Sequence, residues 1–193
     1  MTVRQQFMKA GYPFLRWLNN ITGANKSCRT SDVNATVPIY NLMANVSGGE
    51  NISFSDFSGR KILIVNTASD CGFTAQYAEL EALYQLHKQT LTIIAFPSND
   101  FKQQEQKTDS EILTFCQRNF GVSFLVTKKA AVKKGNNQQP IFEWLCDSKK
   151  NGWNDEEPNW NFCKYLINES GDLTHVFGPG YPPLEIPVDG KEA

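Results

Sequence analysis

Histidine and paired-cysteine motifs are scarce in this sequence, and their scarcity excludes several kinds of site. Only His87 and His175 occur, and no cysteine stands at the spacing that zinc sites use. The five cysteines are an odd number in a chain of 193 residues, and no two form a CxxC pair. They are Cys28, Cys71, Cys116, Cys146 and Cys163. We therefore expect no bound metal, no other cofactor and no framework of structural disulfides.

Long hydrophobic runs and an excess of one charge are also absent. No segment reaches the roughly 18 apolar residues that cross a bilayer. The net charge of −1 argues against a protein that binds nucleic acid through bulk charge. Arg16 interrupts the apolar stretch near the N-terminus, and no small-residue cleavage site follows it, so we do not expect a signal peptide. These features together predict a cytoplasmic protein.

The chain divides by composition into an N-terminal extension, residues 1–35, and one domain, residues 36–193. Pro13 is expected to open a short helix in the extension, and Gly23 is expected to end it. The apolar side of this helix would carry Phe14, Leu15, Trp17, Leu18 and Ile21. We favour docking of this helix on the domain over contact with a membrane or a partner.

The first half of the domain has the pattern of a βαβ unit. Residues 37–57 alternate weakly around a glycine pair, which suggests a hairpin. Residues 61–66 and 91–96 are short continuous apolar runs, typical of strands buried on both faces. Residues 74–88 between them have helical spacing. The two buried strands should therefore be parallel neighbours.

The second half adds helices and an antiparallel pair of strands. A helix capped by Asp109 or Ser110 should run to about Asn119, and Pro140 should start another after a polar loop at 128–139. Residues 162–167 and 173–177 flank a turn sequence and predict a hairpin. The predicted fold is α/β, with a mixed central sheet and helices on both faces.

Cys71 stands where such folds place their chemistry. It occupies the turn between a buried strand and the start of a helix. Free backbone N–H groups and the helix dipole at this position favour a thiolate, although a buried, inert cysteine would fit the position equally well. A lowered pKa would gain only about 2–3-fold in rate, because nucleophilicity falls with basicity. A fast thiol therefore also needs hydrogen-bond donors around it.

Three side chains could supply those donors. Gln104 lies in the irregular loop after the second buried strand, on the same side of the sheet as Cys71. Trp160 and Asn161 directly precede the strand expected at 162–167. An indole donates one hydrogen bond and each amide two. From the residues alone, a surface glutamine, a core tryptophan and a turn asparagine remain open alternatives.

Three ordered motifs resemble the signatures of the glutathione peroxidase family. The first is Ile-Val-Asn-Thr-Ala-Ser-Asp-Cys-Gly-Phe-Thr at residues 64–74, and the second is Phe-Pro-Ser-Asn-Asp-Phe at 96–101 with Gln104-Glu105. The third is Trp160-Asn161-Phe162. The resemblance covers about residues 37–185 and departs from the usual pattern in the second motif. The departures are Ser98, Asp100, Lys102, Gln103 and Gln106, which predict a differently shaped loop around Gln104.

The resemblance implies a thioredoxin-like fold and reduction of hydrogen peroxide or organic hydroperoxides. It implies that Cys71 attacks the peroxide, supported by Gln104, Trp160 and Asn161. The setting of Cys116 resembles the resolving-cysteine helix of the thioredoxin-dependent branch, so thioredoxin is the expected reductant. Cys116 also shares an apolar face with Ile112 and could be plain core. In that case its helix must partly unwind before a disulfide with Cys71 can form.

Other interpretations remain open at this stage. A glutathione-dependent cycle would act on the Cys71 sulfenic acid directly and would not need Cys116. A redox sensor that passes its oxidation to a partner protein would use the same two cysteines. A binding module without catalysis is disfavoured because all four proposed site residues are present. The short loop at 128–139 leaves no room for an oligomerisation insert, which in this family suggests a monomer.

Overall fold

The computed structural model describes residues 2–3, 5–7, 10–14 and 26–190. Its centre is a six-stranded sheet in the order β1-β8-β7-β4-β5-β6. The strands are β1 (Cys28–Thr30), β4 (Lys61–Thr67), β5 (Leu91–Pro97), β6 (Leu125–Val126), β7 (Lys164–Ile167) and β8 (Leu173–Phe177). β4, β5 and β6 run parallel, whereas β7 and β8 are antiparallel to their neighbours.

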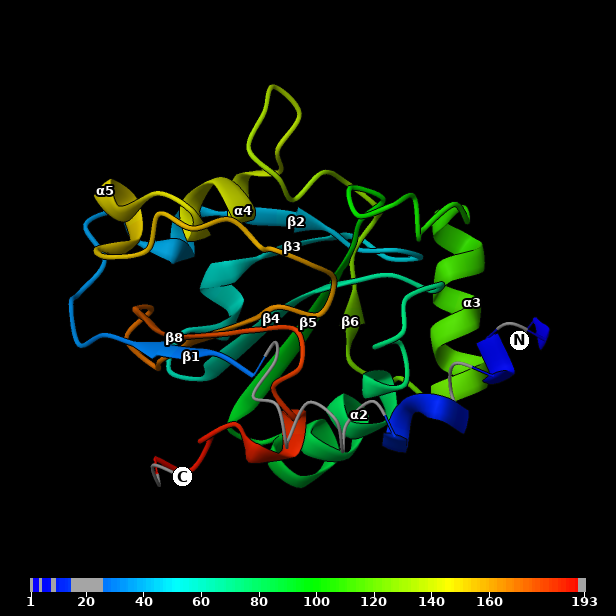
Figure 1. Ribbon diagram of the computed structural model, residues 1–193. Helices are drawn as coiled ribbons and strands as arrows, with labels where there is room; N and C mark the ends of the chain where they lie inside the picture. Colours follow the sequence, from blue (N-terminus) through cyan, green and yellow to red (C-terminus); the bar gives the residue numbers. More distant parts are fainter. Residues whose placement is uncertain (1, 4, 8–9, 15–25, 191–193) are drawn as a thin grey trace.

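Helices cover both faces of this sheet, as the sequence predicted (Figure 1). α2 (Gln76–His87) and α3 (Asp109–Phe120) pack on one face. α4 (Pro140–Leu145) and the small β2–β3 hairpin (Met43–Asn45 and Asn51–Ser53) pack on the other, and α5 (Ser148–Asn151) follows α4. Three 3-10 turns complete the fold: η1 (Ile39–Asn41), η2 (Phe54–Phe57) and η3 (Pro183–Glu185).

The alternation of side chains along the central strands creates two separate cores. Leu63 and Val65 of β4 point into the core beneath α2 and α3. Ile62 and Ile64 point into the core beneath α4. β4 is buried on both faces because it is a central strand, which explains its continuous apolar run. We call these the α2/α3 core and the α4 core.

The predicted βαβ unit is confirmed: β4 and β5 pair in parallel from Lys61–Leu91 to Thr67–Pro97, with α2 between them. The antiparallel β2–β3 and β7–β8 pairs are confirmed as well. Two boundaries differ. The cap of α3 is Thr108, whose hydroxyl accepts from the Glu111 N–H in a capping box. β7 begins at residue 164 because Phe162 has a φ of +69°, which is incompatible with an extended strand.

The sheet also begins earlier than the expected domain boundary at residue 36. β1 lies within the predicted extension, yet it pairs with β8 along the sheet edge from Cys28–Phe177 to Thr30–His175. β1 has only three residues, and their exposure alternates too briefly to give a strand pattern in the sequence. It is recognised as a strand only through its pairing with β8. The two-part division of the chain remains a prediction.

Part of the N-terminal extension is described and is helical. Residues 10–14 are helical, so Pro13 lies within a helical stretch and does not open one. The predicted residues Leu15, Trp17, Leu18, Ile21 and Gly23 lie outside the described part of the chain. Within the residues that are described, no helix combines the length and apolar character that a bilayer span requires.

Candidate active site

Cys71 lies in the turn that joins β4 to α2, as predicted, and its side chain is 0% exposed. The backbone of this turn is fixed by Thr74. The Thr74 hydroxyl is 3.1 Å from the Cys71 N–H and 2.9 Å from the Ala68 carbonyl. The turn therefore holds the Cys71 sulfur at the carboxyl end of β4, at the same edge of the sheet as the loop that follows β5 and the loop that precedes β7.

One N–H group donates to the Cys71 sulfur, and three further polar groups influence its ionisation. The Phe73 N–H donates to the sulfur at 3.4 Å. The Gly72 N–H and the side chains of Trp160 and Asn161 also favour the thiolate. All four interactions lower the pKa of Cys71 because they stabilise the thiolate.

Burial outweighs these donors in the structure. The pKa of Cys71 is raised above its ordinary value, first of all because the sulfur is desolvated. The backbone N–H groups of the turn do favour a thiolate, in the direction that the sequence predicted, but desolvation exceeds their effect on the pKa. The start of a helix stabilises an anion only if water or enough hydrogen-bond donors compensate for the cost of desolvation.

Gln104 reaches the site through Asn161. The Asn161 amide donates to Gln104 Oε1 at 2.9 Å, while the Gln104 carbonyl accepts from the Asp70 N–H at 3.0 Å. The structure thus brings Cys71, Gln104, Trp160 and Asn161 together, from three separate parts of the chain. Asn161 is fully buried and Trp160 is partly buried.

The Asn161 loop is held by a neighbour in β4. The Asn66 amide donates to the Trp160 carbonyl at 2.9 Å, and the Phe162 N–H donates to the Asn66 carbonyl. Asn66 belongs to the first signature motif and Trp160 to the third. The contact explains how two distant motifs build one site.

Glu105 is a site residue that sequence reasoning used only as part of a motif. Its carboxylate accepts from both the N–H and the hydroxyl of Ser69 at 2.8 Å, and the side chain is fully buried. It therefore ties the Gln104 loop to the Cys71 turn. Burial raises the pKa of Glu105, which shows that its carboxylate is costly to keep ionised there. Its place beside Gln104 in the second motif was the one available signal.

The Gln104 loop contains two backbone conformations that are rare for residues other than glycine. Lys102 and Gln103 both adopt positive φ, +49° and +52°, where side chains are disfavoured. The Lys102 ammonium lies 5.4 Å from the Trp160 ring centroid. Asp100 accepts from the N–H groups of Val132 and Lys133, which fixes the loop to residues 128–139. A hollow of about 370 Å³ beside this loop is lined by Asp70, Lys102, Gln103, Gln104 and Gln106.

Cys116 lies on the buried side of α3, with 0% exposure, in the same α2/α3 core as Cys71. Burial is the main reason that its pKa is raised to about 12, although the Tyr77 hydroxyl acts in the opposite direction. Cys116 is therefore a thiol here and is packed as core. All five cysteines are unpaired in the structure.

The other three cysteines lie elsewhere. Cys146 and Cys163 belong to the α4 core, on the opposite face of the sheet from Cys71. Cys28 is exposed on the edge strand β1. Among the described residues, no three potential metal-ligating side chains come together.

Known proteins resemble this chain over most of its length. The family model for glutathione peroxidase matches residues 39–146. The glutathione peroxidase homolog BsaA of Halalkalibacterium halodurans is 41% identical over 155 residues, covering 80% of this chain and 98% of the relative. The glutathione peroxidase-like peroxiredoxin gpx1 of Schizosaccharomyces pombe is 44% identical over 151 residues, covering 78% and 94%.

Solved structures agree with these sequence matches. The apo crystal structure of Trgpx superposes with a TM-score of 0.60 at 28% identity, covering 78% of this chain and 91% of that one. A thioredoxin family protein from Chlorobium tepidum shares the fold at 12% identity, with a TM-score of 0.53 and coverage of 76% and 88%. The fold is therefore thioredoxin-like, as predicted, and the chain is a peroxidase that belongs to the glutathione peroxidase family.

Proposed function

We propose that this protein is a two-cysteine thiol peroxidase that reduces hydrogen peroxide or organic hydroperoxides and is recycled by thioredoxin. The observation that carries the proposal is the setting of the Cys71 sulfur, which accepts from the Phe73 N–H and whose thiolate is favoured by the Gly72 N–H, Trp160 and Asn161. Donors in this arrangement stabilise both a thiolate and the oxygen that leaves during attack. Relatives named glutathione peroxidase-like peroxiredoxins support the same conclusion.

The first step is attack of the Cys71 thiolate on one peroxide oxygen. A sulfur–oxygen bond forms and the oxygen–oxygen bond breaks, so sulfur is oxidised to a sulfenic acid and the peroxide is reduced. The departing alkoxide or hydroxide takes up one proton and leaves as an alcohol or water. The indole N–H of Trp160 and the amide of Asn161 are placed to stabilise this developing charge.

The second step is attack of the Cys116 sulfur on the Cys71 sulfenic acid. A disulfide forms and the hydroxyl leaves as water. Both cysteines are buried in the α2/α3 core, and burial keeps Cys116 as a thiol, so the Cys71 turn, α3 or both must move before this step. A dithiol such as that of thioredoxin then reduces the disulfide by exchange.

A titration of the reduced protein with one equivalent of hydrogen peroxide tests this cycle. We expect mass spectrometry to find a Cys71–Cys116 disulfide that thioredoxin reduces with turnover. The matched control for Cys116→Ala is Cys146→Ala, since both thiols are buried and both have pKa values raised to about 12. Only Cys116→Ala should abolish thioredoxin-dependent turnover.

Each other outcome points to a different cycle. A stable sulfenic acid on Cys71 with Cys116 free would indicate a one-cysteine cycle reduced by glutathione. Stoichiometric transfer of oxidation to one partner protein, without turnover, would indicate a redox sensor. An unmodified Cys71 would contradict a peroxidatic role for this residue.

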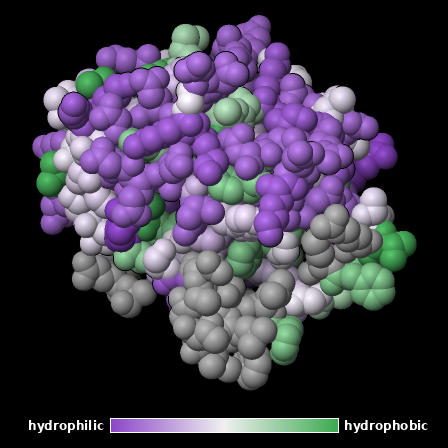
Figure 2. Space-filling view, turned by 45° about the horizontal axis from the view of Figure 1, so that its top comes forward, coloured by the Kyte–Doolittle hydropathy of each residue, from purple (hydrophilic) through white to green (hydrophobic). Residues whose placement is uncertain are grey.

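We also propose that the protein is a monomer and that it works in the cytoplasm. The face that carries the 128–139 loop is largely hydrophilic, so it offers no broad apolar surface for self-association (Figure 2). Light scattering after size-exclusion chromatography should give a mass near the 21.8 kDa of one chain. A dimer mass would contradict the monomer.

A further inference from the structure

The N-terminal segment, residues 2–14 as far as described, contacts the turn that carries Cys71. The Gln5 side-chain amide donates to Asp70 Oδ1 at 2.7 Å and lies 3.4 Å from the Ser69 carbonyl. Gln5 is only 4% exposed. These two acceptors belong to the residues immediately before Cys71. Gln5 itself lies outside the region matched to the peroxidase family, which is residues 39–146.

Local structure fixes the orientation of Gln5. Its side-chain oxygen accepts from the Thr2 N–H at 2.8 Å, while its own N–H donates to the Thr2 hydroxyl at 3.3 Å. This reciprocal pair is a capping box at the start of a helical turn. One amide therefore does two things: its oxygen caps the segment, and its nitrogen holds Asp70.

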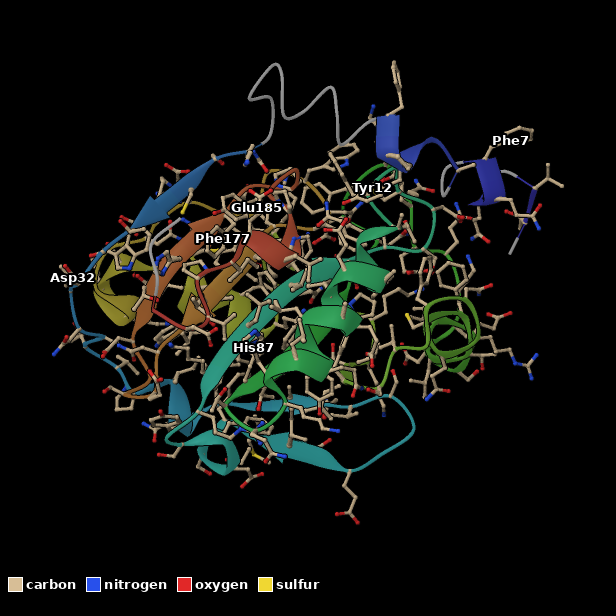
Figure 3. All side chains as sticks on the ribbon, turned by 90° about the horizontal axis from the view of Figure 1, so that it is seen from below. Phe7, Tyr12, Asp32, His87, Phe177 and Glu185 are labelled. Carbon is tan, nitrogen blue, oxygen red and sulfur yellow. The ribbon has the colours of Figure 1, made fainter. Side chains whose placement is uncertain are left out.

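The same segment faces α3. Thr2 and Gln5 line one side of a hollow of about 480 Å³, and Ser110, Thr114 and Arg118 are among the residues of its other side. Asp70 also receives an ion pair at 3.5 Å from Lys107, which lies just before α3. Figures 1 and 3 show the N-terminal segment beside α3 and the start of α2, with Phe7 turned away from the body.

We infer that Gln5 is a positioning residue that holds the Cys71 turn in the reduced arrangement and thereby slows formation of the Cys71–Cys116 disulfide. This inference rests on the proposed resolving role of Cys116. Both sulfurs are fully buried, so the Cys71 turn, α3 or both must move before the disulfide forms. Asp70 joins the two parts, and Gln5 is its contact from the N-terminal side.

The attack on peroxide should depend much less on Gln5. None of the four groups that favour the Cys71 thiolate comes from the N-terminal segment. The free energy of a hydrogen bond to a charged acceptor is large enough to slow a reaction by about tenfold, if the bond must break before the transition state is reached. Loss of the Gln5 donor should therefore speed resolution by about tenfold and change the peroxide step by less than about twofold.

The decisive variant is Gln5→Glu. A glutamate keeps the oxygen that accepts from Thr2, so the capping box persists, but it removes the donor and places a carboxylate against Asp70. The matched control is Gln6→Glu, which adds the same charge at the exposed neighbouring residue. Gln5→Ala removes both interactions and serves as the second variant.

Two measurements on the full chain separate the steps. Rapid quenching after one equivalent of hydrogen peroxide gives the rates of sulfenic acid and disulfide formation. The peroxide concentration that converts half of Cys71 to sulfinic acid gives the competition between resolution and overoxidation. We expect this concentration to rise about tenfold in Gln5→Glu and Gln5→Ala, and to stay unchanged in Gln6→Glu.

The outcomes distinguish the two proposals. Equal disulfide rates in Gln5→Glu and Gln6→Glu, with a normal wild-type disulfide, would overturn the role of Gln5 alone. A loss of both steps in Gln5→Glu would show general destabilisation and would also overturn it. Failure of the wild type to form the Cys71–Cys116 disulfide would overturn the resolving role of Cys116 and this inference with it.

Discussion

The chemistry of Cys71 depends on a balance between burial and donors at a single sulfur. Desolvation raises its pKa, while two backbone N–H groups, Trp160 and Asn161 lower it. The two backbone N–H groups belong to the turn itself, and the Phe73 N–H is the largest of the four influences that lower the pKa. The side chains of Trp160 and Asn161 add to them and can be removed one at a time.

We predict that Trp160→Phe raises the pKa of Cys71 further, because it removes one donor to the thiolate. The rate at which Cys71 reacts with peroxide increases with pH as the thiol ionises. In the variant, this increase should occur at a higher pH than in the wild type. At pH 7 we expect a loss of about 10- to 100-fold. The rate of alkylation of Cys71 from pH 6 to 10 measures the shift.

Trp153→Phe is the matched control for this substitution. The Trp153 indole donates to the Leu173 carbonyl at 2.6 Å and makes no contact with Cys71. Its loss should leave the alkylation profile in place. Identical profiles for Trp160→Phe and the wild type would contradict a role of the indole in stabilising the thiolate.

Lys164 is a second buried titratable group, on β7. Its ammonium is fully buried and donates to the carbonyls of Pro179 and Tyr181 at 3.1 and 2.7 Å. Desolvation lowers its pKa from 10.5 to about 7. In the unfolded chain the ordinary value applies. Between about pH 7 and 10.5, the unfolded state therefore binds more protons than the folded state.

This difference predicts a pH dependence of stability. The pKa of Lys164 is lower in the folded state than in the unfolded state. The contribution of this ionisation to the free energy of unfolding is therefore fully present above pH 10.5, and it is lost as the pH falls through about 7. The free energy of unfolding should therefore rise by up to about 1.4 kcal/mol per pH unit within that window. Lys164→Met should remove this part of the slope. Urea unfolding at pH 7.5, 8.5 and 9.5 compares the two proteins, and parallel slopes would contradict the prediction.

At the scale of elements, α3 is capped at both ends, although the proposed disulfide would require part of it to move. A Thr108–Glu111 capping box begins it and Gly121 ends it in the left-handed conformation. These features stabilise the reduced arrangement, in which Cys116 is core. If Cys116 resolves the sulfenic acid through movement of α3, part of the same helix must be released.

We predict that Thr108→Ala speeds disulfide formation by about fivefold, since loss of an N-cap costs about 1 kcal/mol of helix stability. Ser53→Ala is the control, because Ser53 makes the same kind of capping box in η2, beside the α4 core. Both variants should lose similar unfolding free energy. Only Thr108→Ala should change the rate in a quenched single-turnover experiment; equal rates would place the barrier outside α3.

The regular elements were largely predictable from the sequence, because their patterns are local. β4 and β5 are continuous apolar runs, and α2 shows its buried face at helical spacing. β1 and β6 were not predictable, because they have only three and two residues. Segments this short show no alternation in the sequence and form strands only through pairing with a neighbour. The start of β7 was misplaced because the positive φ of Phe162 leaves no mark in the sequence.

The motifs pointed to four residues that the structure brings together, but the hydrogen bonds that join these residues to each other and to their neighbours could not be predicted. The bond from Asn161 to Gln104, and the bonds from Ser69 to Glu105, join residues far apart in the chain. Burial of the Cys71 sulfur depends on the packing of all of them. The direction of its pKa shift was therefore beyond the reach of sequence reasoning, and the contact of Gln5 with Asp70 lies in a segment without any motif.

At the scale of the whole molecule, oxidation should change the structure on the α2/α3 face of the sheet and leave the α4 face unchanged. Cys71 and Cys116 both belong to the α2/α3 core. Hydrogen–deuterium exchange of the disulfide form should show faster exchange in α3 than in the reduced form. Amides of α4 and of the β2–β3 hairpin should exchange equally in both forms, since they pack on the opposite face. Faster exchange throughout would indicate global loosening instead.

The separation of the two cores has a consequence for the fidelity of the redox cycle. A sulfenic acid can be captured by any thiol that reaches it, and this chain holds four others. Cys146 and Cys163 pack in the α4 core, on the opposite face of the sheet from Cys71, and Cys28 is exposed on the edge strand β1. The central sheet thus separates Cys71 from two of the four other thiols and leaves Cys116 as the one that shares its core, which should limit the number of wrong disulfides.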